Sequence, residues 1–268
     1  MAYKINNNLD HLGFVRVEPS QSLRAYIDSY WFIDAVCDKP RGFQEFLHPD
    51  GGMGFIFNYG DNLLFNGQVI QDKACLDGVS TKSTLLILTE NIKAAGIRFK
   101  PAGASVFLDS PLHELKDQRV STRDLNSSLF ANLYDQISEH KNLNEKVFII
   151  EQALIEALRP DRIISTRMTN AIQQLNNSQG RIALSVLSQQ LNINQRKLER
   201  LFKKQLGMSG GDYAKIIRIE QARSLLKKTK LPLAEAAYKL SFYDQAHFIK
   251  SFKSVVGITP GQYRSNCR

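Results

Sequence analysis

Two stretches in the carboxy-terminal half of the chain repeat one pattern of residues. The matching positions share an offset of 50 residues: Leu198 with Phe248, Phe202 with Phe252, and Gly207 with Gly257. A short segment precedes each stretch, 184–191 before the first and 233–240 before the second, at an offset of 49 residues. In both stretches apolar residues recur at helical spacing and basic residues fall on the opposite side. The pattern predicts two units of two short helices joined by a tight turn, the helix-turn-helix arrangement.

Short polar residues and glycines mark the ends of the second helix in each unit. Asn194 and Asp244 stand where the helices should begin, and their side-chain oxygens can accept hydrogen bonds from free N–H groups of the first turn. Gly207 and Gly257 stand where the helices should end, because glycine readily adopts the left-handed conformation of that position. We therefore expect a short recognition helix in each unit, apolar inside and basic outside.

Charge is distributed unevenly along the chain. Residues 161–268 contain 19 Lys and Arg against 6 Asp and Glu, a net charge of +13. The preceding residues contain 16 basic and 20 acidic residues, a net charge of −4. Such asymmetry is expected if only the carboxy-terminal part meets a polyanion. A solvated basic surface would also give this balance, but the duplicated unit favours nucleic acid.

Several motifs in this part resemble the DNA-binding domain of the AraC/XylS family of bacterial transcription regulators. They occur in order between residues 162 and 264: Leu198-Glu-Arg200-Leu-Phe202-Lys-Lys-Gln-Leu-Gly207, Arg218-Ile-Glu-Gln-Ala222-Arg, Phe242-Tyr-Asp-Gln-Ala-His-Phe248, and Gly257-Ile-Thr-Pro260-x-x-Tyr263-Arg264. The chain departs from the family at two turns. Ser241 stands where the family usually has glycine, and Ser209-Gly210 stands in place of Ser-Pro, so turn rigidity and local stability are the properties affected.

The resemblance implies two recognition helices in successive major grooves about 34 Å apart. The residues expected to reach base edges are Arg196, Lys197, Glu199, Arg200, Gln245, Ala246, His247 and Lys250. Those expected at phosphates are Asn194, Lys203, Lys204, Asp244 and Lys253. Two roles stay open: Glu199 either reads a cytosine amine or restrains Arg196, and Arg264 either contacts DNA or ties the last helix to the core.

Further signals place the remaining helices of this domain. Asp161 is a candidate cap for a helix over 162–177. Ser209 can cap a long helix that runs to about residue 228, and Pro232 suits the first turn of the next helix. The long helix is expected to hold the two units rigidly apart.

The amino-terminal part is rich in short β-strand patterns. Apolar or aromatic runs lie at 13–17, 30–34, 54–59, 63–65, 68–70, 85–88 and 94–99, separated by turn signals such as Pro49-Asp-Gly-Gly52. Many closely spaced strands favour a small barrel. We predict an α+β protein with a β-rich small barrel and flanking helices at 1–110, a helical linker or dimerisation region at 111–160, and an all-α DNA-binding domain at 161–268.

Two segments of this part, 47–58 and 96–104, resemble the sensory domain of a subgroup of AraC-type regulators. The resemblance implies a domain that binds a small-molecule effector or carries a dimer contact. The candidate pocket residues are Trp31, His48, Phe55, Phe57, Tyr59 and Arg98. Aromatic residues in strands more often belong to the core, and His48 fits a surface position beside the Pro49-Asp50 turn. Both interpretations stay open.

Apolar residues at helical spacing follow residue 111. Leu125, Leu129, Leu133 and Ile137 form one stripe, and Val147, Ile150, Leu154 and Leu158 form another. Each stripe could pack on its own barrel or form a dimer seam, and a homodimer is the state the resemblance implies. Pro160 would end the second helix.

Motifs for other functions are absent from the sequence. There is no nucleophile elbow, phosphate-binding glycine loop or His-Glu-x-x-His helix, and Glu45, His48 and His113 do not form a recognisable metal triad. Cys37, Cys75 and Cys267 have neither disulfide nor zinc spacing, and no stretch suits a signal peptide or membrane helix. We expect a cytoplasmic protein with no catalytic site, metal or cofactor.

The functional expectation is a sequence-specific, dimeric transcription regulator that binds promoter DNA and works with RNA polymerase. The family includes activators and repressors. One alternative is an effector-independent architectural DNA-binding protein, whose first domain would have no cavity. Another is an enzyme with an appended DNA anchor, such as a DNA-repair alkyl transferase, for which a set of four cysteine ligands would be needed.

Overall fold

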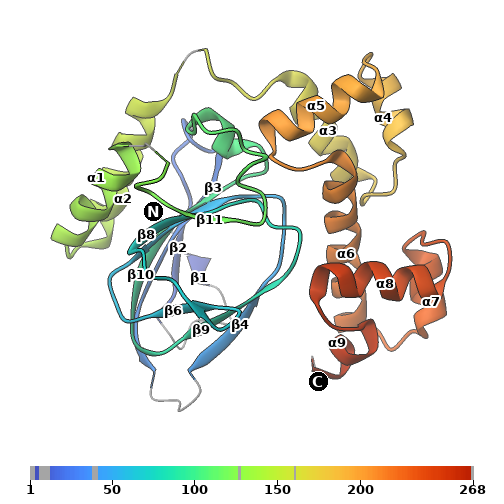
Figure 1. The fold of residues 1–268 in the computed structure, drawn as a ribbon, viewed down its shortest axis with the longest axis horizontal. Coiled ribbons are helices and arrows are strands. Elements are labelled where there is room, and N and C mark those ends of the chain that lie inside the picture. Colours follow the sequence, from blue (N-terminus) through green and yellow to red (C-terminus); the bar gives the residue numbers. More distant parts are fainter. Residues whose placement is uncertain (1–3, 6–12, 38–41, 126–127, 160, 267–268) are drawn as a thin grey trace.

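The computed structural model describes residues 4–5, 13–37, 42–125, 128–159 and 161–266 (Figure 1). Strands form the first part and helices the second, so the predicted α+β fold is confirmed. A 3₁₀ turn, η2 (Gly103–Val106), follows the last long strand. No helix in these ranges is long and apolar enough to cross a membrane.

The strands form two antiparallel sheets. The larger has the order β1 (Lys4–Ile5), β2 (Val15–Val17), β3 (Ile27–Cys37), β10 (Glu90–Phe99), β5 (Gly54–Asn58), β8 (Ala74–Asp77), β11 (Arg119–Ser121). The smaller has the order β4 (Phe43–Leu47), β9 (Thr84–Leu88), β6 (Leu63–Phe65), β7 (Gln68–Val69). Each strand pair is antiparallel.

Both faces of the larger sheet are buried, and this explains its near-continuous apolar sequence. Along β5, Phe55 and Phe57 point into the main core, whereas Ile56 points into a smaller core shared with the four-stranded sheet. Alternate residues of a strand face opposite sides, so burial of both sides leaves no polar position between them. The structure thereby assigns these two phenylalanines to the core.

Helices α1 (Ser128–Glu139) and α2 (Leu143–Ala157) cover the outer face of the larger sheet. Phe130 of α1 stacks on Phe55 with ring centroids 3.7 Å apart. From α2, the buried Glu151 accepts hydrogen bonds from the Ser20 backbone N–H at 2.6 Å and from the Tyr30 hydroxyl at 3.4 Å. The stripe residues Leu133, Ile137, Val147, Ile150 and Leu154 are buried in the main core, so both stripes pack on their own domain.

The β-rich part extends past residue 110, where we expected it to end. Arg119–Ser121 form β11, which pairs with β8 at the edge of the larger sheet. The strand has only three residues, too few for a period-two signal.

The first helix of the second domain also begins later than the expected residue 162. Its cap is Ser165, whose hydroxyl accepts from Met168 N–H, and not Asp161; Pro160 lies outside the described residues.

The second domain consists of helices in the order expected. Their bounds are α3 (Thr166–Asn177), α4 (Leu184–Gln190), α5 (Gln195–Gln205), α6 (Gly210–Lys228), α7 (Leu233–Lys239), α8 (Gln245–Val256) and α9 (Pro260–Asn266). Ser209 caps α6, as predicted, by accepting from Asp212 N–H at 2.9 Å. Ile216 and Ile217 of α6 pack with the first unit, and Ile219 packs with the second. The long helix therefore joins the cores of both units (Figure 1).

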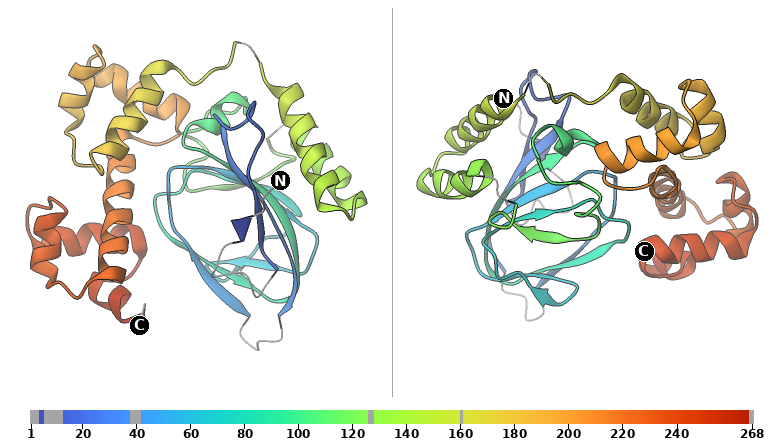
Figure 2. Two further views of the ribbon diagram at one scale, coloured as in Figure 1. Left: turned by 180° about the vertical axis from the view of Figure 1, so that it is seen from behind. Right: turned by 45° about the horizontal axis from the view of Figure 1, so that its top comes forward.

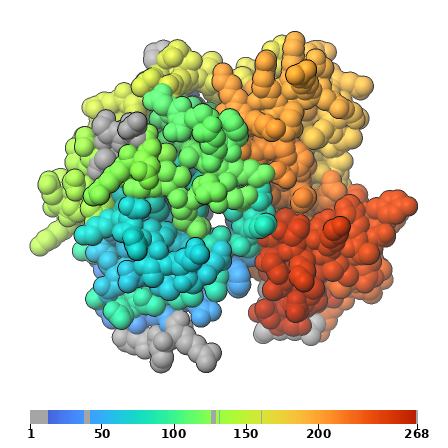
Figure 3. Space-filling view, in the orientation of Figure 1, coloured from blue at the N-terminus to red at the C-terminus, as the bar shows by residue number. Residues whose placement is uncertain are grey.

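The two domains lie side by side (Figures 2 and 3). The main core runs from the larger sheet into the first helix-turn-helix unit. Lys116 Nζ lies 2.9 Å from Asp212 Oδ2 near the start of α6. At the second unit, Ser83 N–H donates to the Val255 carbonyl at 2.7 Å. The β-rich domain therefore contacts both helix-turn-helix units.

Candidate nucleic-acid interface

Both predicted recognition helices, α5 and α8, begin at the predicted capping residues. The side-chain oxygen of Asn194 accepts from Lys197 N–H at 2.8 Å, and the carboxylate of Asp244 accepts from His247 N–H at 2.6 Å. Each bond satisfies one free donor of the first helical turn. Because these side chains serve as caps, the other N–H groups of the first turn are the ones left for a phosphate.

The turns inside the two units share one backbone geometry. Asn192 and Ser241, 49 residues apart, have positive φ angles of 52° and 56°. Equivalent hydrogen bonds of 3.0 Å close the turns: Ile193 N–H to the Ser188 carbonyl and Phe242 N–H to the Ala237 carbonyl. Ser241 thus takes the left-handed conformation that glycine adopts most easily, at a cost of about 1–2 kcal/mol.

The predicted contact residues lie on the outward faces of the two helices. Exposed residues on α5 are Arg196, Lys197, Arg200, Lys203 and Lys204, and those on α8 are Gln245, Ala246, His247, Lys250 and Lys253. The half-buried Glu199 lies 3.8 Å from Lys203 Nζ, so it restrains this lysine and not Arg196. Among the described residues, the side chains of Arg196, Arg200 and Lys204 have no ionic or hydrogen-bonding partner.

Two further arginines hold the helical domain together. Arg218 of α6 donates to the Gly180 carbonyl at 2.6 Å, and its guanidinium lies 5.3 Å from the centre of the Phe242 ring. Burial lowers the pKa of Arg218. Arg264 of α9 donates to the Leu231 carbonyl at 2.7 Å. Of the two roles left open for Arg264, the structure shows the one that ties the last helix to its domain.

Two exposed tyrosines beside the second turn were not among the predicted residues. The exposed fractions are 86% for Tyr238 and 93% for Tyr243. Tyrosine hydroxyls are common donors to DNA phosphates. The repeat could have shown that Tyr238 is unusual, since Gln189 stands at the equivalent position of the first unit.

The structure does not bring the six candidate pocket residues together. Phe55 and Phe57 lie in the main core. The Tyr59 hydroxyl donates to the Tyr134 carbonyl at 3.0 Å. The remaining three are spread over the domain: Trp31 stacks beside Phe14, Arg98 forms an ion pair with Asp50, and His48 contacts the second domain.

The candidate metal ligands and cysteines are also dispersed. Glu45 and His48 lie near the cations of α6, whereas His113 lines a cleft beside α5. Cys37 and Cys75 are buried free thiols, and Cys267 lies outside the described residues. Within the described ranges, no three His, Cys, Asp or Glu residues are grouped to hold a metal ion.

His48 lies at the contact between β4 and the second unit. Its Nδ1 is 2.7 Å from the Ser83 hydroxyl, and its ring meets the Tyr263 ring edge-on at 6.2 Å. Burial, with Arg223 and Lys227 nearby, lowers the pKa of His48 to about 3. His48 is therefore neutral in the folded protein at neutral pH.

Acidification should weaken the fold through His48. An unfolded histidine has a pKa near 6.5, so the unfolded state binds the extra proton first, and stability falls as the pH drops from about 6.5 towards 3. We expect the unfolding free energy of the wild-type protein to fall more between pH 7 and pH 5 than that of His48→Gln, measured by urea denaturation. Equal losses in the two proteins would contradict this role.

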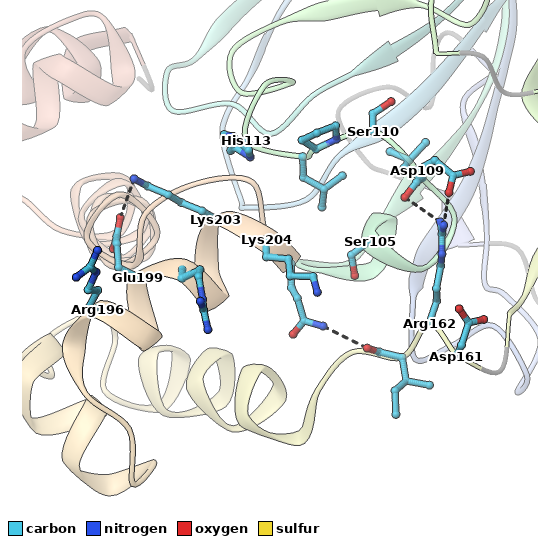
Figure 4. Close-up of a pocket in the computed structure, with 16 residues that line it drawn as sticks. Ser105, Asp109, Ser110, His113, Asp161, Arg162, Arg196, Glu199, Lys203 and Lys204 are labelled. Carbon is cyan, nitrogen blue, oxygen red and sulfur yellow. Dashed lines mark hydrogen bonds and ion pairs between the residues drawn. The ribbon is translucent and has the colours of Figure 1, made fainter.

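A cleft of about 870 Å³ lies between α5 and the segment 105–113 of the first domain (Figure 4). One side is lined by residues of α5: Arg196, Glu199, Arg200, Lys203, Lys204 and Gln205. Ser105, Asp109, Ser110 and His113 line the other, and Arg162 lies at the base. The predicted reading face of α5 therefore faces the first domain across this cleft.

Known proteins are similar to the helical domain of this chain. A family described as a helix-turn-helix domain matches residues 187–266. The arabinose operon regulatory protein of Salmonella typhimurium is 30% identical over 129 residues, which are 47% of this chain and 45% of that protein. The chain belongs to the AraC/XylS family of transcription regulators. The helix-turn-helix family match begins within α4 and covers α5 to α9.

Other relatives of this AraC/XylS-family chain match different lengths of it. The regulator GbdR of Pseudomonas aeruginosa is 36% identical over 168 residues, covering 62% of this chain and 43% of GbdR. The solved carboxy-terminal domain of the response regulator AraT from Geobacillus stearothermophilus is 32% identical, with a TM-score of 0.37, covering 38% of this chain and 87% of that one. Residues 15–121 match a domain of unknown function, DUF6597. The chain covers 18%, 45% and 44% of the first three curated relatives.

Proposed function

We propose that this protein is a sequence-specific transcription regulator that reads two successive major grooves of promoter DNA with α5 and α8. The observation that carries the proposal is the pair of structurally equivalent units whose outward faces are exposed and basic. Helix α6 contains 19 residues and is therefore about 28 Å long. A spacer of this length suits the separation of about 34 Å between successive major grooves.

The side chains divide by chemistry into base readers and phosphate contacts. Arg196 and Arg200 have guanidinium groups free to bond guanine O6 and N7. On α8, Gln245, His247 and Lys250 are the equivalent readers, with Ala246 against a thymine methyl. Lys203, Lys204 and Lys253 supply affinity through phosphates, with the capped helix starts at Asn194 and Asp244, and Tyr243 adds a hydroxyl beside the second turn.

The first domain is proposed to regulate this DNA binding. It packs against both units, so a signal that changes its contacts would change the spacing or access of the recognition helices. We further propose a homodimer that forms through the outward face of α2, where Phe148 is 63% exposed and Ile155 lies two turns further on. In this proposal the protein is not an enzyme, acts in the cytoplasm, and affects transcription through RNA polymerase.

Replacing Arg200 by alanine should weaken binding to the preferred site by about 1–3 kcal/mol and relax specificity at one base pair, because a bidentate contact to guanine is lost. The preferred site would first be obtained by selecting genome fragments at about 150 mM salt, where non-specific binding is weak. Affinity is then measured by fluorescence anisotropy on that site and on single-base variants.

The matched control is Arg24→Ala, which removes one exposed arginine from the first domain. It should leave affinity and specificity unchanged. Unchanged binding by Arg200→Ala would refute its role as a base reader. Recovery of unrelated fragments by the wild-type protein, with no common site, would refute sequence-specific regulation.

A further inference from the structure

We propose that the cleft between α5 and the segment 105–113 binds a small multivalent anion, and that this anion competes with DNA for α5. The ligand class is a molecule with at least two carboxylate or phosphate groups. The proposed anion site is argued only from the cleft. The proposed competition also depends on the proposed DNA-binding function.

The charge of the cleft favours an anion. The α5 side contributes four cations and one carboxylate, and Glu199 is already engaged by Lys203. At the base, Arg162 is engaged by Asp109, which leaves Asp161 as the other acidic lining residue. Arg196, Arg200 and Lys204 have no partner among the described side chains. These three cations line one cleft, and like charges gathered in a cleft attract an opposite charge.

The opposite wall supplies hydrogen-bond donors from the first domain. Ser110 and His113 line the cleft and have no hydrogen-bonding partner among the described residues. A hydroxyl and an imidazole can both donate to carboxylate or phosphate oxygens. An anion between the walls would therefore be bonded from both domains at once.

The cleft is formed before any ligand arrives, because hydrogen bonds fix its base. Arg162 donates to the Leu108 carbonyl at 3.2 Å and pairs with Asp109. At the end of α5, Gln205 donates to the Ile163 carbonyl at 3.2 Å and accepts from the Ser165 hydroxyl at 2.7 Å. A volume of about 870 Å³ is within the usual range of small-molecule sites.

DNA cannot reach the outward face of α5 while the segment 105–113 stays beside it. The cleft faces the side of α5 opposite its buried Leu198 and Phe202, which is the side that would enter the major groove. That groove is about 12 Å wide, and a helix with its side chains is about 10–12 Å across. No room remains for a second protein segment across the reading face. DNA binding by α5 therefore requires the segment 105–113 to move away, and a bridging anion would oppose this movement.

The binding site is tested without DNA by calorimetric titration of the full chain with citrate or inorganic pyrophosphate, at ionic strength balanced with chloride. We expect saturable binding, and the relative affinities of the two probes show whether the site prefers carboxylates or phosphates. Ser110→Glu places a negative charge inside the cleft and should weaken binding at least about tenfold. The control Ser138→Glu adds the same charge at an exposed position on α1 and should change affinity less than about twofold.

Competition is tested by adding the better probe to the complex of the protein with a fluorescent DNA site. Saturating anion should lower DNA affinity, and by linkage DNA should lower anion affinity by the same factor. Absence of saturable binding, or equal weakening in both serine variants, would overturn the site. An unchanged DNA affinity at saturating anion would overturn the competition. If the protein binds no specific DNA, the proposed function fails, while the calorimetric titration still decides the site.

Discussion

Replacing Phe252 by alanine is expected to lower the unfolding free energy of the second helix-turn-helix unit by about 3–5 kcal/mol. Phe252 is fully buried, and its ring meets the rings of Phe248 and Tyr263 edge-on, with centroids 5.9 Å and 5.4 Å away. The core around it belongs to helices α6 to α9 and is separate from the main core. A small core has few neighbours to fill the cavity, so this unit should unfold before the rest of the protein.

Hydrogen exchange measures this local effect directly. In Phe252→Ala, amide protons of α7 to α9 should exchange much faster than in the wild-type protein, while those of the larger sheet should change little. The control is Tyr243→Ala, whose side chain is 93% exposed and should alter stability by less than about 0.5 kcal/mol. Uniform loss of protection throughout the chain would show that the second unit does not unfold separately.

Replacing Gly207 by alanine is expected to destabilise the protein by about 2–4 kcal/mol, more than the same change at the repeat-related Gly257. Both glycines have positive φ, 85° and 89°. An alanine methyl at 207 would lie 2.7 Å from the Leu112 carbonyl oxygen and 3.0 Å from the Met53 methyl, both in the first domain. At Gly257 a methyl would meet nothing within 4 Å, so only the backbone cost of about 1–2 kcal/mol remains.

The two glycine variants are controls for each other, because the local conformation is the same. Urea denaturation of each variant gives the difference in unfolding free energy. We also expect Gly207→Ala to loosen the contact between the domains, seen as faster cleavage near residue 160 by a protease, whereas Gly257→Ala should not. Equal destabilisation by both changes would mean that the contact between Gly207 and the first domain contributes no stability.

Local chemistry made the helical domain predictable from the sequence. Asn194, Ser209 and Asp244 cap their helices as expected, since capping depends on a side chain and on N–H groups two or three residues further on. The repeat at 49 to 50 residues also predicted that both units share one geometry, which the turns at Asn192 and Ser241 confirm. The prediction that Asp161 caps this helix was wrong, because Ser165 caps it one turn later.

The first domain was less predictable because its arrangement depends on distant contacts. Phe55 and Phe57 alternate along a strand and would suit a pocket or a core equally well. Contacts with distant rings, those of Phe99 and of Phe130 from α1, place Phe55 in the core. Likewise Arg119–Ser121 become a strand only because β8 offers an edge to pair with.

The sequence by itself determined the features set by neighbouring residues: the duplicated helix-turn-helix units, their caps and stops, and the basic outward faces of α5 and α8. The tertiary structure decided which of two equivalent positions is crowded and which is free. Gly207 lies against the first domain and Gly257 does not, and the outer face of α5 borders a cleft with that domain. The physical reason is the separation along the chain over which each interaction acts. Capping and helical periodicity act over a few residues, whereas packing between domains joins residues about a hundred positions apart.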